Sequence, residues 1–111
     1  MNLLSKSKAF WRKVRRRTRL NRIIHVNSRD ELPLKLGAAI YIVGNENPKW
    51  AVLECPCRCG ERIDVNLMHA RRPAWQLMAK NGKATLQPSL WLPSEKCGSH
   101  FWIRNNQIIW V

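Results

Sequence analysis

Two short cysteine-containing segments constrain this chain more than any other feature of its sequence. The first spans residues 55–60 (CPCRCG) and the second spans residues 97–100 (CGSH). Thiolate and imidazole groups are the ligands that zinc prefers, and structural zinc sites hold four of them in a tetrahedron. If both segments contribute to one site, two loops that are distant in the sequence must meet in space. The sequence therefore predicts a small domain in which two ligand-bearing loops share a zinc ion.

The two segments offer five candidate ligands for four positions. Cys97 and His100 form one natural pair, and two of the three cysteines in the first segment would form the other. Two long-range disulfides in an exported protein, or unliganded buried thiols, are the alternatives, but thiols of cytosolic proteins are usually reduced. Which cysteine is not a ligand stays open. The candidate zinc ligands are Cys55, Cys57, Cys59, Cys97 and His100.

A catalytic role for the zinc is a weaker alternative. A catalytic ion keeps one coordination position open and needs a nearby base. Glu61 follows the first segment and would be that base, but no H-x-E or H-E-x-x-H pattern accompanies it. Ser89 and Ser99 have no recognisable nucleophile context, and the chain barely has the residues for a triad. We therefore expect a binding module rather than an enzyme, with a zinc hydrolase that uses Glu61 as base as the alternative.

Hydrophobic periodicity and turn residues predict a β fold. Asn81-Gly82 and Asn105-Asn106 each separate two apolar runs, which is typical of β-hairpins. The fold class that follows is mostly β, a small antiparallel zinc-ribbon-like β-domain with an N-terminal basic helix. We predict an extension over residues 1–21 and a zinc-binding β-domain over residues 22–111. Strands are expected over residues 22–26, 38–43, 50–55, 62–67, 75–79, 83–86, 100–104 and 107–111, and a turn or one helical turn over 28–32.

The extension carries most of the charge. The chain has a net charge of +13, and its first 29 residues contain ten basic residues and no acidic one. Apolar residues at helical spacing within residues 3–20 predict an amphipathic helix with a cationic face. Such a face suits nucleic acid or another polyanion, an anionic membrane surface, or solvent alone. The candidate polyanion-binding residues are Arg12, Lys13, Arg15, Arg16, Arg17 and Arg19.

No secretory signal and no apolar run of membrane-spanning length is visible, so we expect a cytoplasmic protein without a transmembrane segment. Six tryptophans are many for 111 residues. Those late in the chain are interleaved with arginine, which suits a binding surface, although tryptophan also fills small cores. The candidate partner-binding residues are Arg72, Trp91, Trp102 and Arg104.

The same residues carry a resemblance to a known family. CPCRCGE at 55–61, Arg72-Pro73 with Trp75, Pro88-Ser89 with Trp91, and Cys97 with SHFWIR at 99–104 occur in this order. Together they resemble a small bacterial family catalogued as domain of unknown function 6527. The resemblance covers the chain from about residue 50 onward. It implies a zinc-binding protein encoded near antiphage defence or ubiquitin-like conjugation genes. The function implied is an adaptor, accessory or E3-like component, with a ubiquitin-like protein or an E2-like enzyme as its partner.

Overall fold

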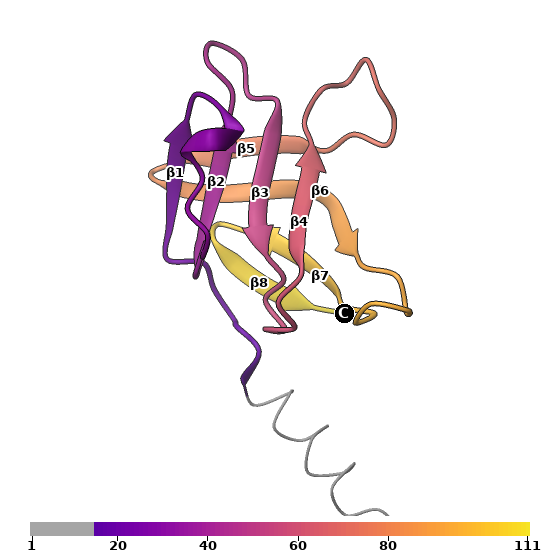
Figure 1. The fold of residues 1–111 in the computed structure, drawn as a ribbon. Helices are drawn as coiled ribbons and strands as arrows, with labels where there is room; N and C mark the ends of the chain where they lie inside the picture. Colours follow the sequence, from indigo (N-terminus) through magenta and orange to yellow (C-terminus); the bar gives the residue numbers. More distant parts are fainter. Residues whose placement is uncertain (1–14) are drawn as a thin grey trace, which may run out of the picture.

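Two four-stranded β-sheets make up the part of the chain that the computed structural model describes, residues 15–111 (Figure 1). The mostly β class predicted from the sequence is confirmed, with two sheets in place of one ribbon. In Figure 1 the strands of the second sheet run across those of the first. The first sheet has the order β1 (Arg22–Val26), β2 (Ala39–Val43), β3 (Trp50–Glu54) and β4 (Arg62–Asn66), and the second has the order β5 (Gln76–Lys80), β6 (Lys83–Trp91), β7 (His100–Arg104) and β8 (Gln107–Trp110).

Neighbouring strands are antiparallel except β1 and β2, which are parallel. A parallel pair needs a connection that returns the chain to the same end of the sheet. Residues 27–38 provide it and include a short 3-10 helix, η1 (Arg29–Glu31). The Glu31 carboxylate accepts a hydrogen bond from the Ser28 N–H at 3.0 Å, which satisfies a free amide at the start of η1. The sequence predicted a turn or one helical turn here.

Both predicted hairpins form. Asn81 and Gly82 have φ of 54° and 71°, and Asn105 and Asn106 have φ of 49° and 65°. Two consecutive residues with positive φ are the requirement of the two-residue turn that matches the twist of paired strands, and asparagine and glycine adopt it most readily. These turns join β5 to β6 and β7 to β8.

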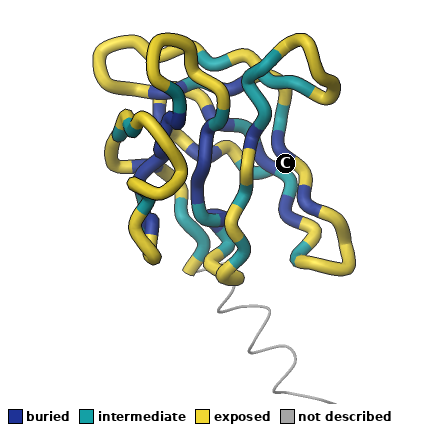
Figure 2. Tube along the Cα trace, turned by 45° about the horizontal axis from the view of Figure 1, so that its top comes forward, coloured by how far each residue is buried: buried dark blue, intermediate teal, exposed yellow. Residues whose placement is uncertain are grey.

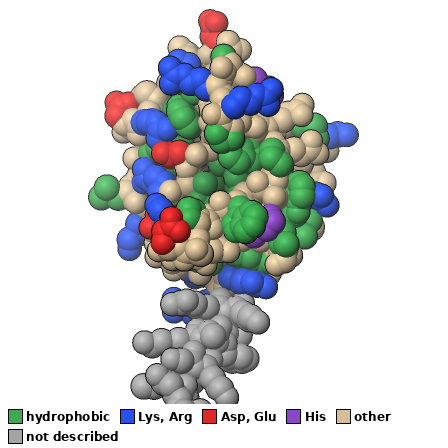
Figure 3. Space-filling view, turned by 90° about the vertical axis from the view of Figure 1, so that its right-hand side faces the viewer, with side chains coloured by type: hydrophobic (Ala, Val, Ile, Leu, Met, Phe, Trp, Pro, Cys, Tyr) green, Lys and Arg blue, Asp and Glu red, His purple; other side chains and the backbone are tan. Residues whose placement is uncertain are grey.

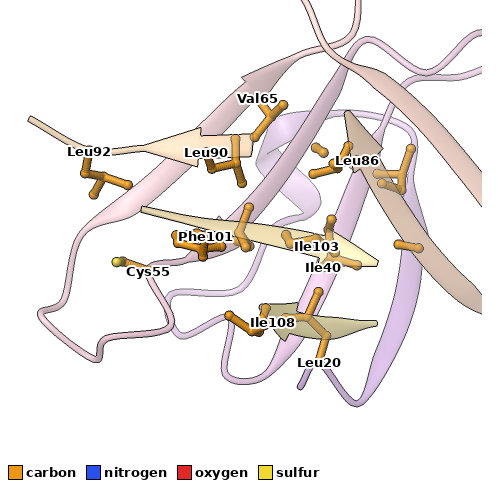
Figure 4. Packing of buried hydrophobic residues seen from close by; sticks show 14 residues of the cluster. Leu20, Ile40, Cys55, Val65, Leu86, Leu90, Leu92, Phe101, Ile103 and Ile108 are labelled. Atoms are coloured by element: carbon orange, nitrogen blue, oxygen red, sulfur yellow. The ribbon is translucent and has the colours of Figure 1, made fainter. Parts of the chain in front are cut away.

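The main core lies between the two sheets. Ile40, Leu53 and Val65 from the first sheet meet Phe101 and Ile103 from the second, and each is at most 1% exposed (Figure 4). A second cluster covers the other face of the first sheet. The inner residues of β2 are therefore buried on both faces, which explains why its sequence, AIYIV, is continuously apolar. Exposed residues gather instead in the connecting loops (Figure 2).

From residue 16 onward, the segment before β1 is not helical. Arg19 forms an isolated antiparallel bridge with Gln107, and Leu20 is 4% exposed within the main core. The predicted helix is therefore wrong over residues 16–20. Leu20 packs into the core there, and the backbone pairs with β8. The rest of that prediction, including Arg12 and Lys13, lies outside the described residues. Over residues 15–111 no helix has the length and hydropathy to cross a membrane.

Candidate functional site

All four cysteines lie at one end of the molecule, in two loops from different sheets. Cys55, Cys57 and Cys59 are in the loop between β3 and β4, and Cys97 is in the loop between β6 and β7. The first loop closes with a hydrogen bond from the Cys55 N–H to the Glu61 carbonyl at 2.8 Å. Figure 4 shows Cys55 at one end of the main core, beyond Phe101. The core therefore fixes the base of the first loop directly beneath the cysteines.

The sulfur atoms are spaced as ligands rather than as disulfide partners. All four lie within 4.8 Å of one another, and the Sγ of Cys55 is 3.4 Å from that of Cys57 and 3.7 Å from that of Cys97. A disulfide bond is only about 2.05 Å long. A tetrahedral ion with metal–sulfur distances of about 2.3 Å separates its sulfurs by about 3.8 Å. The cluster could therefore hold a metal ion.

The cysteines differ in how readily they ionise without a metal. Burial raises the pKa of the Cys55 thiol far above its ordinary value of 9.0, because the thiolate would lose its hydration. Burial also opposes ionisation of Cys97, but hydrogen bonds with Ser99 outweigh it and lower the pKa of Cys97 to about 7. Of these two thiols, Cys97 more readily supplies a thiolate at neutral pH.

His100 is not a member of the four-cysteine group. Its Nε2 lies 2.9 Å from the Oγ of Ser89, and its ring stacks on the indole of Trp91 with centroids 4.7 Å apart and planes 5° from parallel. The sequence offered five candidate ligands and left one cysteine spare. The structure gathers all four cysteines and directs one ring nitrogen of His100 to a serine.

A β-bulge brings Ser89 to His100. Leu86 pairs with Ile103 and Leu90 pairs with Phe101. An advance of four residues along β6 therefore corresponds to only two residues along β7. The two additional residues disrupt the ladder between Leu86 and Leu90, the stretch that contains Ser89, and bulges commonly redirect a side chain in this way. The expectation that Ser89 has no nucleophile context missed this contact. Knowledge of the β6–β7 register would have revealed the contact, because Trp91 pairs with His100 and Ser89 lies two residues before Trp91 on the same face of β6.

A family model matches residues 27–111, and its description is bacterial ubiquitination-like system serine protease (BubE). The chain belongs to this family. The matched region contains the four cysteines, Ser89 and His100. The BubE match confirms the predicted link to bacterial ubiquitination-like systems. No curated protein and no solved structure matches the chain significantly.

The four predicted polyanion-binding residues that the structure describes in this BubE family member, Arg15, Arg16, Arg17 and Arg19, fall into two groups. Arg15 and Arg19 are exposed. Arg16 lies over the Trp110 ring, 4.4 Å from its centroid, and a guanidinium nitrogen of Arg17 is 3.8 Å from a carboxylate oxygen of Glu54. The main chain of Arg17 also donates to the Pro56 carbonyl and accepts from the Trp110 indole N–H at 2.9 Å. Arg16 and Arg17 therefore make contacts within the domain.

The predicted partner-binding residues lie apart from one another in the chain but are mostly accessible. Arg72 and Arg104 are exposed, and Trp91 is 73% exposed. Trp102 is half-buried beneath the Arg104 guanidinium, 4.8 Å from its ring centroid. Trp91 and Trp102 share the outer face of the second sheet, because their strand neighbours Leu90, Phe101 and Ile103 point into the core. That face also carries Ser89 and His100.

Proposed function

We propose that this chain is a serine hydrolase of a bacterial ubiquitination-like system that cleaves amide bonds, with Ser89 as nucleophile and His100 as its general base. The single observation that carries the proposal is the 2.9 Å contact between the Ser89 Oγ and the His100 Nε2. Serine is a weak nucleophile until a neighbouring base accepts its proton, and this separation is within the range such pairs require. The description of the BubE family as a serine protease supports the same assignment.

The chemistry follows from the two side chains. His100 removes the hydroxyl proton as the Ser89 Oγ attacks the carbonyl carbon of the scissile amide, and an ester forms. The protonated imidazole then gives that proton to the leaving amine as the carbon–nitrogen bond breaks. A water molecule, deprotonated by His100, hydrolyses the ester and restores the hydroxyl of Ser89.

The His100 ring is held without a carboxylate partner in the described part of the chain. Two contacts orient it: the Ser89 hydroxyl at Nε2 and the parallel indole of Trp91 on its face. A triad would add an acid that fixes the tautomer of the histidine. We therefore propose a serine–histidine dyad in which Trp91 supplies the orientation of the ring.

We further propose that the cysteine cluster binds zinc and that the ion is structural. Four thiolates fill a tetrahedral zinc and leave no open position for water. They give the site a net charge of about −2, which Arg58 and Lys96 beside the cluster offset. Glu61, the base of the alternative zinc hydrolase, instead accepts a contact from the Lys96 ammonium at 3.1 Å. When bound, the ion would tie the two loops together.

A serine-directed fluorophosphonate probe tests the function without requiring the natural substrate. We expect the purified protein to be labelled at Ser89, and both Ser89→Ala and His100→Ala to lose labelling by about a thousandfold. Ser94→Ala, an exposed serine in the neighbouring loop, is the control and should be labelled normally. Equal labelling of Ser89→Ala and the unmodified protein would exclude Ser89 as nucleophile. An adaptor or E3-like role, which the sequence predicted, would leave all these proteins unlabelled but still able to bind a ubiquitin-like partner.

A further inference from the structure

The outer edge of β4 is an unpaired strand edge. β4 is the last strand of the first sheet and pairs only with β3. In this antiparallel pair the Cys55 N–H bonds to the Glu61 carbonyl, and the Leu67 N–H bonds to the Lys49 carbonyl. Because backbone groups alternate in direction along a strand, those of Arg62 and Asp64 must point away from β3. Among residues 15–111 these groups form no hydrogen bond with another strand.

The end of β6 has an open edge as well. β5 accompanies β6 only as far as Gln87, so the residues from Ser89 to Trp91 have β7 on one side and no strand on the other. The Ser89 carbonyl on the open side accepts a hydrogen bond from the Trp75 indole N–H at 3.3 Å. The Leu92 N–H bonds to Ser99 of the β7 side, so the backbone groups of Trp91 face the open side.

A groove of about 260 Å³ lies between these two edges. Its walls include Ile63 and Val65 of β4 and Trp75, Trp91 and Leu92 near the end of β6. Figure 3 faces this side of the molecule and shows hydrophobic side chains gathered across its middle, with charged side chains around them. Trp91 connects the groove to the proposed dyad, since it lines the groove and also stacks on His100.

The groove is electrically balanced in a chain whose net charge is +13. Its charged lining residues are two acids and two bases, and most of them already have partners. Glu61 pairs with Lys96 at 3.1 Å, and Asp64 pairs with Arg29 at 3.3 Å. An acidic ligand would find better partners at the exposed arginines elsewhere. The occupant that complements the groove is therefore an uncharged chain with free backbone donors and acceptors.

From these edges, we infer that the groove binds an extended, uncharged segment of the substrate protein, which adds as a strand to β4 and leads its scissile bond past Trp91 to Ser89. This inference rests on the proposed function for the cleavage step, but not for binding. Addition of a strand to an open edge supplies main-chain hydrogen bonds that are largely independent of sequence, and apolar walls select the side chains.

The test uses a pool of capped octapeptides with uncharged side chains as the probe, and the Ser89→Ala protein so that binding is observed without turnover. Hydrogen exchange at the Arg62 and Asp64 amides is measured residue by residue. We expect saturating peptide to slow exchange at both amides by about tenfold or more, and pools with acidic or basic side chains to do so less. Unchanged exchange at these two amides at the solubility limit of the pool would overturn the inference.

A backbone substitution provides a second, independent measurement. Asp64→Pro removes an outward-facing N–H without removing a bond to β3, which is where edge strands tolerate proline. Asp64→Ala is the matched control, because it loses the same ion pair to Arg29 but keeps the N–H. We expect Asp64→Pro to weaken peptide binding about tenfold relative to Asp64→Ala, and equal binding by the two variants would contradict strand addition.

The two proposals fail in different ways. Slower exchange at Arg62 and Asp64 together with no cleavage of the pool by the unmodified protein would retain the groove and remove the hydrolase. Cleavage without any effect at Arg62 and Asp64 would retain the hydrolase and remove the groove.

Discussion

The cysteine cluster and the Ser89–His100 pair both include residues of the β6–β7 hairpin, yet different structural elements hold them together. The cluster draws its sulfurs from loops of two different sheets. The serine–histidine pair comes from adjacent strands of one sheet, and the register of these strands, including the bulge between Leu86 and Leu90, sets the separation. A bound ion can therefore contribute to the stability of the whole domain. The Ser89–His100 pair instead depends on a sheet that is stable without it.

If the cluster binds structural zinc as proposed, loss of that ion is the change with the largest expected effect on stability. Binding of structural zinc contributes on the order of 10 kcal/mol in small zinc domains, because the unfolded chain has no site. We expect Cys97→Ser, or chelation, to abolish the cooperative thermal transition measured by circular dichroism. Ser94→Ala in the same loop should melt as the unmodified protein does. An unchanged transition after complete removal of the metal would show that the core alone holds the sheets together.

Acid should release the metal as well, which a colorimetric zinc indicator can follow from pH 8 to pH 5. Protons compete with zinc for each thiolate, so affinity falls as the pH falls. Burial raises the pKa of Cys55, so the proton is held more tightly there and the competition begins at a higher pH than for an exposed thiol. Metal-dependent stability is thus present at high pH and is lost on acidification. Retention of zinc at pH 5 would contradict thiolate ligation.

Ser89→Ala should produce the opposite pattern from the cysteine variants. We expect hydrolysis of a cleavable peptide to fall by about a thousandfold, while the free energy of unfolding changes by less than about 1 kcal/mol. Stopped assays of peptide cleavage and urea denaturation measure the two quantities on the same protein. A large loss of stability would mean that the Ser89–His100 contact is structural.

Trp91→Ala should have a smaller effect on the same site. Removal of the indole frees one face of the His100 ring and lets it rotate, which we expect to lower the cleavage rate constant kcat about tenfold. Stability should change by less than about 1 kcal/mol, because Trp91 is 73% exposed. Trp91→Phe keeps a flat ring and should restore most of the rate. If Trp91→Phe is as slow as Trp91→Ala, stacking is not what orients the histidine.

Arg17→Ala and Arg15→Ala should show the smallest of these differences, a difference in the free energy of unfolding. Arg17 is half-buried beside Glu54, so its loss should cost about 1 kcal/mol of unfolding free energy. Arg15 is exposed, and its loss should cost less than about 0.5 kcal/mol. Equal effects in urea denaturation would show that the contact between Arg17 and Glu54 contributes nothing to the cysteine end of the domain.

Much of the fold was predictable because its signals are local. Alternating or continuous apolar runs and the two asparagine-containing turns located the strands to within one or two residues, except β6, which continues to Trp91. The cysteine spacing indicated the cluster, because two ligand-bearing loops had to meet. Those features depend on a few neighbouring residues, and short windows of sequence contain them.

The serine–histidine pair was not predictable in this way. The Ser89–His100 contact depends on the bulge between Leu86 and Leu90, and nothing in the composition of that segment specifies two additional residues on one strand. The predicted N-terminal helix was also wrong over residues 16–20. Its spacing favoured a helix through Leu20, but contacts with Asn106 and Ile108, distant in the sequence, set an extended backbone there instead.

The contact between the Arg17 carbonyl and the Trp110 indole has a consequence for how the protein is made. The two residues are 93 positions apart in the chain. A ribosome delivers residues in order, so the segment around Leu20 waits for nearly the whole domain to be synthesised before its place beside β8 exists. Contacts of such long sequence separation slow folding, because the entropy of closing a large loop is lost before the contacts form. We therefore expect the first sheet to keep one apolar face uncovered until the second sheet has been synthesised, and closure of the core to be a late step in folding.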